Sequence, residues 1–280
     1  MHPKNPFARD YDFDHLINHD EHLESFVFVN KHGNKTIRFG DPQAVRSLNT
    51  ALLQAAYAVE WSIPDGFLCP PIPGRLDYLL FVSDLFEKKD LRLLDIGTGS
   101  SLIYPILGAC HFKWTCVGSE IDRESAAHAQ SLIDSNPSLA KTKVRIQTNK
   151  KQILKNIIQP EDQFDVMVCN PPFYKTAEDA VKENRRKVKN LGLKKRSKLN
   201  FGGNANELWT HGGEVTFVSN LAAESKNYKT QVGWFTSLVS RQEHLSQIKR
   251  AIEEAGATAV RVVEMGTGNK MSRFVAWRFS

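Results

Sequence analysis

From Leu91 onward, short apolar runs alternate with longer stretches in which apolar residues recur at helical spacing. Most of the short runs are continuously apolar, which is typical of strands covered on both faces. Strand and helix alternation over about 190 residues predicts a doubly wound, mostly parallel α/β sheet. The predicted strands are Leu91–Ile96, Trp114–Ser119, Lys143–Gln147, Phe164–Cys169, Gln231–Leu238, Ala259–Glu264 and Phe274–Phe279.

The stretches between these strands show the periodicity of helices. In one of them, Leu245, Ile248 and Ile252 recur at i, i+3 and i+7, which is one face of a helix. The last two strands follow each other across Met265–Arg273 with no helix between them, so we expect a hairpin that places one antiparallel strand near the C-terminus. The predicted helices are Ser101–Cys110, Arg123–Ser135, Gln152–Gln159, Glu214–Ser225 and Arg241–Ala255.

The first third of the chain has a different pattern. A long helical run starts at Asp41–Pro42, where an aspartate suits the N-cap and a proline suits the first turn. A second helix is expected after the proline-rich segment Cys69–Gly74 and extends to about Phe86. The pattern therefore predicts a mostly helical N-terminal extension, residues 1–88, packed on an α/β core of residues 89–280.

Composition narrows the class of protein. Hydrophobic residues make up 41% and charged residues 24% of the 280 residues, so the chain can bury a real core. No apolar stretch approaches the roughly 18–20 residues that span a bilayer, and the charged, proline-containing start is not a signal peptide. The four cysteines form no C-x-x-C pair, which argues against a zinc site and a disulfide framework. We expect a reduced, intracellular protein without a metal and without a membrane partner.

The positive charge of the chain is concentrated in one segment. Residues 175–203 hold ten basic and three acidic residues, a net charge of +7, whereas the whole chain has a net charge of +6. A concentrated basic segment favours a polyanionic partner, because neutralised phosphates release counterions. The alternative interpretation is a solvated loop without a partner.

A glycine-containing turn follows the first core strand. Asp95-Ile-Gly-Thr-Gly99 allows the backbone to turn sharply and to approach a ligand closely. Leu102 stands where the dinucleotide-binding pattern G-x-G-x-x-G has its third glycine, which disfavours a dehydrogenase. The turn suits a ligand without a pyrophosphate, such as S-adenosylmethionine, although a merely tight strand-to-helix turn would have the same sequence.

An acidic residue ends the next predicted strand. Glu120 lies 21 residues after Gly99, close to the roughly 20 expected for a carboxylate that accepts hydrogen bonds from a ribose diol. Strand ends often carry acidic residues for solubility, so Glu120 alone indicates little. Together with the glycine turn, it indicates a nucleoside-binding site.

The strongest motif is Asn170-Pro-Pro-Phe173, directly after the buried run Phe164–Cys169. The prolines fix the backbone and cannot donate hydrogen bonds. The Asn170 side-chain oxygen and the Pro171 carbonyl are left as acceptors that can hold an NH2 group. Phe173 offers an apolar face for stacking on a planar base. The alternative interpretation is a proline-terminated strand with no further role.

These three motifs resemble those of class I S-adenosylmethionine-dependent methyltransferases that act on a planar amino nitrogen. The segments Asp41–Leu48, Cys69–Arg75, Asp95–Pro105 and His211–Glu214 narrow the resemblance to the methyltransferase-like sixteen family. That family includes eukaryotic enzymes that modify one adenosine of U6 spliceosomal RNA and bacterial 23S ribosomal RNA adenine methyltransferases. The resemblance implies a Rossmann-like fold, the cofactor S-adenosylmethionine and a structured RNA with a single-stranded target adenosine.

The resemblance also implies roles for individual residues. Asn170, Pro171, Pro172 and Phe173 would hold the target adenine in the catalytic site. The family more usually has a small hydroxyl residue at the position of Gln152, where a backbone contact is expected. The cofactor would contact Arg75, Asp95, Gly97, Thr98, Gly99, Glu120, Gln152 and Asn170, and RNA would contact Lys187, Lys189, Lys194, Lys195, Arg196 and Lys198.

The choice of substrate leaves several hypotheses open. We expect N6-methyladenosine formation in U6 RNA, because Tyr174 follows the motif where the bacterial branch commonly has histidine. The segment Lys194–Lys198 could serve in nuclear import, so we expect a nuclear protein. An additional cytoplasmic location is left open, and a cytoplasmic location alone is expected if the protein is bacterial. The alternatives are a 23S ribosomal RNA methyltransferase, an RNA-binding factor with secondary methylation activity, and a protein glutamine methyltransferase. No protein partner is predicted.

Overall fold

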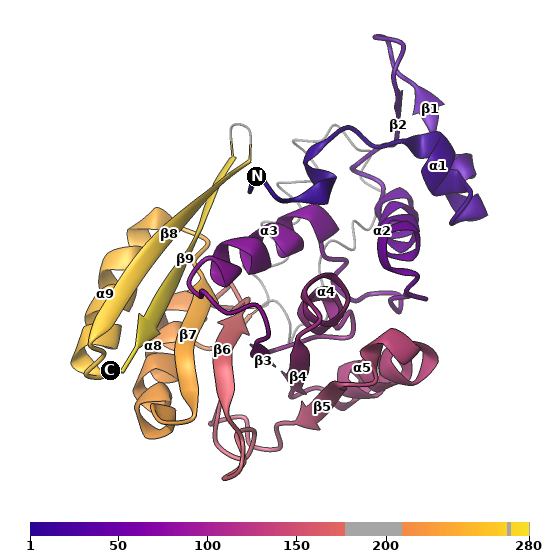
Figure 1. Cartoon of the computed structure of the whole chain (residues 1–280). Coiled ribbons are helices and arrows are strands. Elements are labelled where there is room, and N and C mark those ends of the chain that lie inside the picture. The colour runs from indigo at the N-terminus through magenta and orange to yellow at the C-terminus, as the bar shows by residue number, and fades with distance from the viewer. Residues whose placement is uncertain (177–208, 268–269, 280) are drawn as a thin grey trace.

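The computed structural model describes residues 1–176, 209–267 and 270–279. Its centre is a seven-stranded sheet with the order β5-β4-β3-β6-β7-β9-β8 (Figure 1). A separate two-stranded sheet pairs β1 with β2. The strands are β1 (Phe28–Val29), β2 (Lys35–Thr36), β3 (Arg92–Ile96), β4 (Thr115–Glu120), β5 (Thr142–Ile146), β6 (Phe164–Cys169), β7 (Val232–Leu238), β8 (Ala259–Thr267) and β9 (Lys270–Arg278).

The sheet is mixed in the way that the sequence predicts. Strands β3 to β7 are parallel to one another, whereas β9 is antiparallel to both β7 and β8. In the register of the central strands, Asp95 lies opposite Gly118 of β4, and Ile96 lies opposite Cys169 of β6. The carboxyl ends of β3, β4 and β6 therefore meet at one edge of the sheet, where the three sequence motifs begin. The predicted doubly wound sheet with a C-terminal antiparallel strand is confirmed.

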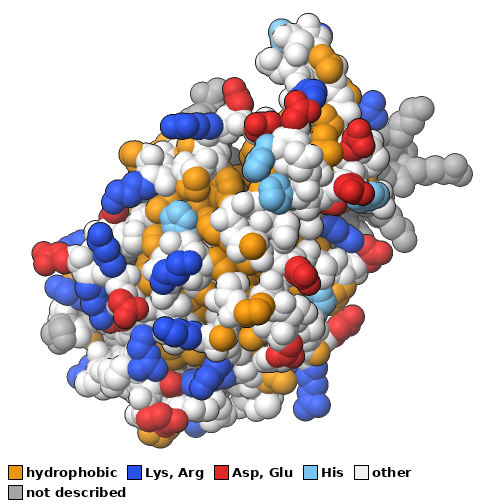
Figure 2. Space-filling view, turned by 45° about the vertical axis from the view of Figure 1, so that its right-hand side comes forward, with side chains coloured by type: hydrophobic (Ala, Val, Ile, Leu, Met, Phe, Trp, Pro, Cys, Tyr) orange, Lys and Arg blue, Asp and Glu red, His pale blue; other side chains and the backbone are white. Residues whose placement is uncertain are grey.

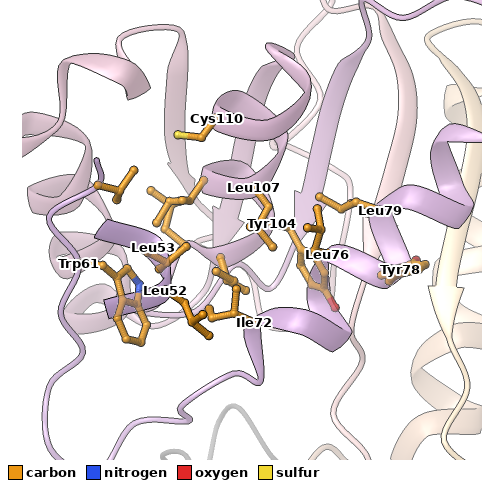
Figure 3. Packing of buried hydrophobic residues seen from close by; sticks show 14 of the residues in the cluster. Leu52, Leu53, Trp61, Ile72, Leu76, Tyr78, Leu79, Tyr104, Leu107 and Cys110 are labelled. Atoms are coloured by element: carbon orange, nitrogen blue, oxygen red, sulfur yellow. The ribbon is translucent and has the colours of Figure 1, made fainter. Parts of the chain in front are cut away.

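Helices cover both faces of the sheet, each with its own hydrophobic cluster. One cluster combines α2, α3 and α4 with one face, and the other combines α8 and α9 with the opposite face. Figure 3 shows part of the first cluster, in which side chains from α2, α3 and α4 pack together. The helices are α1 (Phe13–Ile17), α2 (Pro42–Tyr57), α3 (Ile72–Ser83), α4 (Ile103–Phe112), α5 (Arg123–Ser135), α8 (Gly213–Ser225) and α9 (Leu245–Glu254).

One predicted helix is wrong. The segment Gln152–Gln159 forms a series of turns, although Ile153, Leu154, Ile157 and Ile158 have helical spacing. Leu154 and Ile157 are fully buried in the second cluster, so the apolar pattern reflects burial of the segment and not a helix. Asn156 has a positive φ of 69°, which interrupts any regular helix.

The N-terminal part is largely helical and ends in a helix that packs on the core. Helix α3 lies against α4 and includes Tyr78, whose hydroxyl lies 2.7 Å from the Thr236 hydroxyl of β7. Asp77 of the same helix anchors the chain start, since its carboxylate accepts from the His2 N–H at 2.6 Å and from Asn5 Nδ2 at 3.1 Å. These bonds fix α3 between the first residues of the chain and the sheet.

The sequence pattern did not predict the β1–β2 hairpin, which projects from the body of the molecule (Figure 1, Figure 2). Its strands have two residues each, too short for a periodic signal. Short 3-10 helices also lie in this part, at Pro6–Ala8 and Glu21–Phe26. In the described ranges, no helix has both the length and the apolar character to cross a membrane.

Candidate functional site

The backbone at the carboxyl end of β3 turns through two glycines in left-handed conformations. Gly97 has φ +73° and Gly99 has φ +63°, values that other residues rarely adopt. The N–H groups of Gly97 and Thr98 donate to the carbonyl oxygen of Ser119 in β4, at 3.0 and 2.9 Å. A Cβ at Gly118 would lie 2.9 Å from Thr98 Oγ1, so the neighbouring strand also needs a glycine. The predicted sharp turn is present and rests tightly on β4.

Asp95 lies just before this turn, and its side chain is fully buried. Within the described ranges, neither of its carboxylate oxygens has a hydrogen-bond partner. Burial raises the pKa of Asp95 to about 7, and the charge of Glu120 acts in the same direction; the nearby Thr98 hydroxyl, which lies outside hydrogen-bond geometry, and the charge of Arg75 act in the opposite direction. A buried acid without a partner is costly. The position therefore fits a ligand that brings a hydrogen-bond donor or a positive charge.

Glu120 ends β4 beside the glycine turn and is 6% exposed. Its Oε1 accepts from the N–H groups of Ile121 and Asp122 at 2.7 and 2.9 Å, and its Oε2 accepts from the Gly99 N–H at 2.8 Å. These bonds fix the carboxylate in one orientation, while Oε2 retains capacity for a further donor. Burial raises the pKa of Glu120 above its usual range, and the backbone donors oppose this shift. The arrangement suits a carboxylate held ready for ligand hydroxyls.

Arg75 comes to the same edge of the sheet from the N-terminal part of the chain. The half-buried side chain extends from α3, and its Nη1 donates to the Tyr104 hydroxyl of α4 at 3.0 Å. The guanidinium carbon lies 5.7 Å from the centre of the Tyr104 ring. The effect of Arg75 on the pKa of Asp95 places its positive charge in the surroundings of that carboxylate. A cation and two buried carboxylates therefore share one site.

Gln152 lies in the loop that follows β5, the strand next to β4. Its N–H donates to the Asn149 carbonyl at 3.1 Å, so this backbone donor is already used within the turn. The Gln147 N–H donates to the Glu120 carbonyl at 2.7 Å and joins the loop to β4. The sequence-predicted position is therefore next to the strand that carries Glu120, while the Gln152 N–H itself has a partner within the protein.

Asn170-Pro-Pro-Phe173 begins at the carboxyl end of β6, on the other side of β3. Asn170 Oδ1 is buried, and it has no hydrogen-bond partner among the described residues. Pro171 is buried and Phe173 is half-buried. The chain then pairs Tyr174 with Trp209 in a parallel bridge, which joins the motif to the segment before α8. An unpartnered acceptor beside a half-buried aromatic ring can receive the amino group of a planar base.

Similarity to known proteins identifies the family. A family model described as RNA methyltransferase matches residues 1–280. The chain belongs to this family of RNA methyltransferases. The ribosomal RNA large subunit methyltransferase F of Christiangramia forsetii is 46% identical over 285 residues and covers all of both chains. The protein of the same name from Pectobacterium atrosepticum is 45% identical over 288 residues, which are all of this chain and 93% of that one.

Solved structures confirm the Rossmann-like methyltransferase fold. The human METTL16 catalytic domain in complex with the MAT2A 3′UTR hairpin 1 matches with a TM-score of 0.86 and 30% identity, over 100% of this chain and 96% of that one. The N-terminal domain of human METTL16 in complex with SAH matches with a TM-score of 0.80 and 27% identity, over 100% and 99%. The predicted resemblance to the methyltransferase-like sixteen family is thus confirmed, and the sequence relatives above are bacterial ribosomal RNA enzymes.

The structure explains one motif that the sequence left open. Glu214 is 1% exposed, and its carboxylate accepts from the Ser240 N–H at 2.7 Å and lies 2.5 Å from His244 Nδ1. It joins the start of α8 to the segment before α9 and is engaged there, which argues against a role as general base. Glu224 lies at the end of the helix that follows His211–Glu214 in the family resemblance, but sequence reasoning assigned no role to it or to Gln147, because their partners are backbone groups of a loop. No signal in the sequence marks such contacts.

The predicted RNA-binding residues fall in a part of the chain that the structure does not describe. In the described part, His, Cys, Asp and Glu side chains form no group that could hold a metal ion. Lys175, the first residue of the basic segment, is exposed. The six predicted residues Lys187, Lys189, Lys194, Lys195, Arg196 and Lys198 all lie outside the described residues.

Proposed function

We propose that this RNA methyltransferase forms N6-methyladenosine at one adenosine of large-subunit ribosomal RNA. The observation that carries the proposal is the unpartnered Asn170 oxygen at the end of β6, one strand away from the buried Asp95 carboxylate. Two buried polar side chains without partners need donors from ligands. An amino group of adenine supplies one donor, and an ammonium group of a cofactor supplies the other.

The cofactor in this proposal is S-adenosylmethionine, which supplies an electrophilic methyl group when bound. Arg75, Asp95 and the turn Gly97–Gly99 would hold its amino acid part, and Glu120 would accept from its ribose hydroxyls. In the strand order β5-β4-β3-β6, Glu120 and Asn170 end strands on opposite sides of β3. Asn170 would then lie on the side of the transferred methyl group, and the loop after β5, which contains Gln152, would hold the adenine.

The target adenine would be held by Asn170 to Phe173. Its amino nitrogen is nearly non-basic, because the lone pair is delocalised into the ring. Hydrogen bonds from this NH2 group to Asn170 Oδ1 and the Pro171 carbonyl direct the lone pair toward the methyl group, while Phe173 stacks on the ring. Pro172 keeps this segment rigid. Glu214 is engaged by Ser240 and His244, so it is not assigned as a base, and the proton would leave to water after methyl transfer.

The relatives favour ribosomal RNA over the expected U6 RNA. Two bacterial relatives at 45–46% identity are named for the ribosomal large subunit, whereas the human METTL16 structures are at 27–30% identity. The expectations of U6 RNA, splicing and a nuclear location therefore have no support from the named relatives. Human METTL16 was solved with RNA hairpins, which supports a structured RNA substrate here. We further propose that residues 1–88 and the basic segment contribute to RNA binding.

A direct test maps N6-methyladenosine in total RNA from cells with and without this protein. We expect loss of one modified adenosine in large-subunit ribosomal RNA, restored by the wild-type protein and not by Asn170→Ala. Loss of a site in a small nuclear RNA alone, or methylation of a protein glutamine, would contradict the proposal. Restoration by Asn170→Ala would point to an RNA-binding factor instead.

A further inference from the structure

The loop after β5 is held by one carboxylate from the far end of α8. Glu224 accepts from the Ile153 N–H at 2.9 and 3.1 Å, from the Leu154 N–H at 2.8 Å and from the Lys155 N–H at 3.3 Å. Three consecutive backbone donors thus converge on a single side chain. Hydrogen bonds to a charged acceptor are the stronger kind. This contact fixes the start of the loop on the last turn of α8.

The same loop is held from its other side by Gln147. The side-chain Nε2 of Gln147 donates to the carbonyl oxygens of Ile153 and Lys155, at 3.3 and 2.8 Å. The Leu154 side chain is fully buried between these contacts. Glu224 therefore binds the N–H groups and Gln147 the carbonyl groups of one short segment. Together, Glu224 and Gln147 fix the position of this segment. Because the Gln147 N–H donates to the Glu120 carbonyl, that position is fixed relative to Glu120.

The place of Glu224 in its helix is unfavourable for the helix itself. It lies one residue before the end of α8 (Gly213–Ser225), where the helix dipole favours positive side chains. The next residue, Ser225, accepts from Trp277 Nε1 of β9 at 2.9 Å, so the helix end is fixed on the sheet. The favourable contacts of the Glu224 carboxylate are therefore its hydrogen bonds with the N–H groups of the loop after β5. Glu224 therefore stabilises the loop and not helix α8.

We propose that Glu224 is a positioning residue for the cofactor, acting through residues 152–155. This inference rests on the proposed function, in which the adenine of S-adenosylmethionine lies against the loop after β5. Glu224 would not contact the cofactor itself. It would fix the position of the loop after β5 relative to Glu120, which ends the neighbouring strand β4. Weakening this contact lowers affinity for the adenine end of the cofactor and leaves the methyl-transfer geometry at Asn170 unchanged.

The test is Glu224→Gln, which keeps the size of the side chain but turns one acceptor into a donor facing backbone N–H groups. We expect KM for S-adenosylmethionine to rise about tenfold, equal to about 1.4 kcal/mol, with kcat at saturating cofactor within about twofold. Glu224→Asp retains the charge and should recover part of the affinity. Glu254→Gln is the control, because it neutralises an exposed carboxylate whose described partner is Arg250 and should leave calorimetric cofactor affinity unchanged. A kcat loss without a KM change in Glu224→Gln would overturn the proposal.

A second measurement uses the wild-type protein and therefore does not depend on the folding of a variant. Addition of S-adenosylhomocysteine to the wild-type protein should slow amide hydrogen exchange at residues 153–155, and unchanged exchange there would also overturn the inference. Glu120→Ala separates this failure from failure of the proposed cofactor site. If Glu120→Ala weakens cofactor binding and Glu224→Gln does not, the inference about Glu224 alone is wrong. If neither substitution weakens cofactor binding, the proposed location of the cofactor site is wrong.

Discussion

At the scale of single residues, the site consists of polar side chains whose partners are incomplete. The Asp95 carboxylate and Asn170 Oδ1 are buried without hydrogen-bond partners within the described ranges. Glu120, by contrast, has three backbone donors that orient it. Free acceptors are expensive in a protein interior. Asp95 lies in β3 just before the glycine turn, and Asn170 directly follows the neighbouring strand β6. Their free acceptors therefore mark where donors of a ligand would bind.

Glu120→Ala should weaken S-adenosylmethionine binding by about 1.5–3 kcal/mol, because the ribose hydroxyls lose a charged acceptor. Calorimetric titration measures the effect. Glu243→Gln, on an exposed glutamate that pairs only with Arg241 among the contacts described, is a suitable control for loss of a surface charge. A folded Glu120→Ala protein with wild-type affinity would exclude Glu120 from the cofactor site.

Asn170→Ala should abolish most turnover and leave RNA affinity within a few-fold, because its contact matters most in the transition state. Phe173→Ala should also be severe, since base stacking is worth roughly 1–3 kcal/mol. Single-turnover methylation at saturating RNA and cofactor measures the chemical step. A near-normal rate in Asn170→Ala would contradict the role given to the motif.

Asp95 should make cofactor binding depend on pH. Burial raises its pKa to about 7 in the free protein, so it is largely protonated below that value. A cationic amino group binds the ionised form, and affinity for S-adenosylmethionine should therefore rise as pH increases from about 6 to 8, with release of a proton on binding. Calorimetry in buffers of different ionisation enthalpy measures that proton. Asp95→Asn should show neither effect, and equal pH dependence in the variant would assign it to another group.

The raised pKa of Asp95 also has a consequence for folding. Between the unfolded pKa near 3.8 and the folded value of about 7, the native state binds more protons than the unfolded state. The contribution of Asp95 to the stability of the cofactor-free protein is therefore greatest at low pH and is lost as pH rises through about 7. Ionisation of this buried carboxylate therefore lowers the stability of the fold, and a bound cationic group would offset that cost.

At the scale of elements, α8 joins the two ends of the site. Its first turn carries Glu214, which is bonded to Ser240 and His244, and its last turn carries Glu224, which is bonded to the loop after β5. The segment just before the helix pairs with the chain after Phe173 through Tyr174 and Trp209. One helix thus touches the segment beside the proposed target-base site and the loop beside the proposed adenine site.

Glu214→Gln should lower the free energy of unfolding by about 1–3 kcal/mol, because a buried acceptor of the Ser240 N–H and His244 is replaced by a weaker one. Urea denaturation measures the change. Glu254→Gln, in an exposed i,i+4 pair with Arg250, should change stability by at most about 0.5 kcal/mol. Equal effects of the two substitutions would mean that the buried contact adds nothing to stability.

At the scale of the whole molecule, the proposed site residues and most of the positive charge lie in different parts of the chain. The described core positions the site, whereas the positive charge of the sequence lies mainly in residues 175–203, which begin two residues after Phe173. Because the chain continues directly from the proposed target-base site, the start of this segment must lie near that site. Non-specific affinity for phosphates would then be added beside the residues that hold the base.

Replacement of Lys194, Lys195, Arg196 and Lys198 by alanine should weaken RNA binding and flatten its salt dependence by roughly one to three log–log units, at about 0.7 per phosphate contact. Affinity for S-adenosylmethionine should hardly change, because the cofactor residues lie on other strands. RNA affinity across a salt series measures the slope. Parallel lines for the wild-type and altered proteins would mean that these charges are only a solvated face.

The sequence by itself determined the strands, the glycine turn, the Asn-Pro-Pro-Phe motif and the class of reaction. These features are local: continuous apolar runs mark buried strands, and glycine and proline restrict the backbone where they stand. The order of strand ends along the chain also placed Asp95, Glu120 and Asn170 at one edge of the sheet. The expectation of U6 RNA rested on Tyr174 and on the basic run Lys194–Lys198, and the named relatives favour ribosomal RNA instead.

Only the tertiary structure decided which polar residues support the site and which are free to meet a ligand. Gln152–Gln159 has helical spacing, yet it forms turns: Asn156 has a positive φ, and Glu224, about 70 positions away along the chain, binds the N–H groups at the start of the segment. Glu214 is likewise engaged by Ser240 and His244, from the segment before α9. Such contacts join segments that are distant in sequence, and no periodicity or spacing within either segment records them. Burial and partners of polar atoms are set by packing, and the packing exists only in the folded chain.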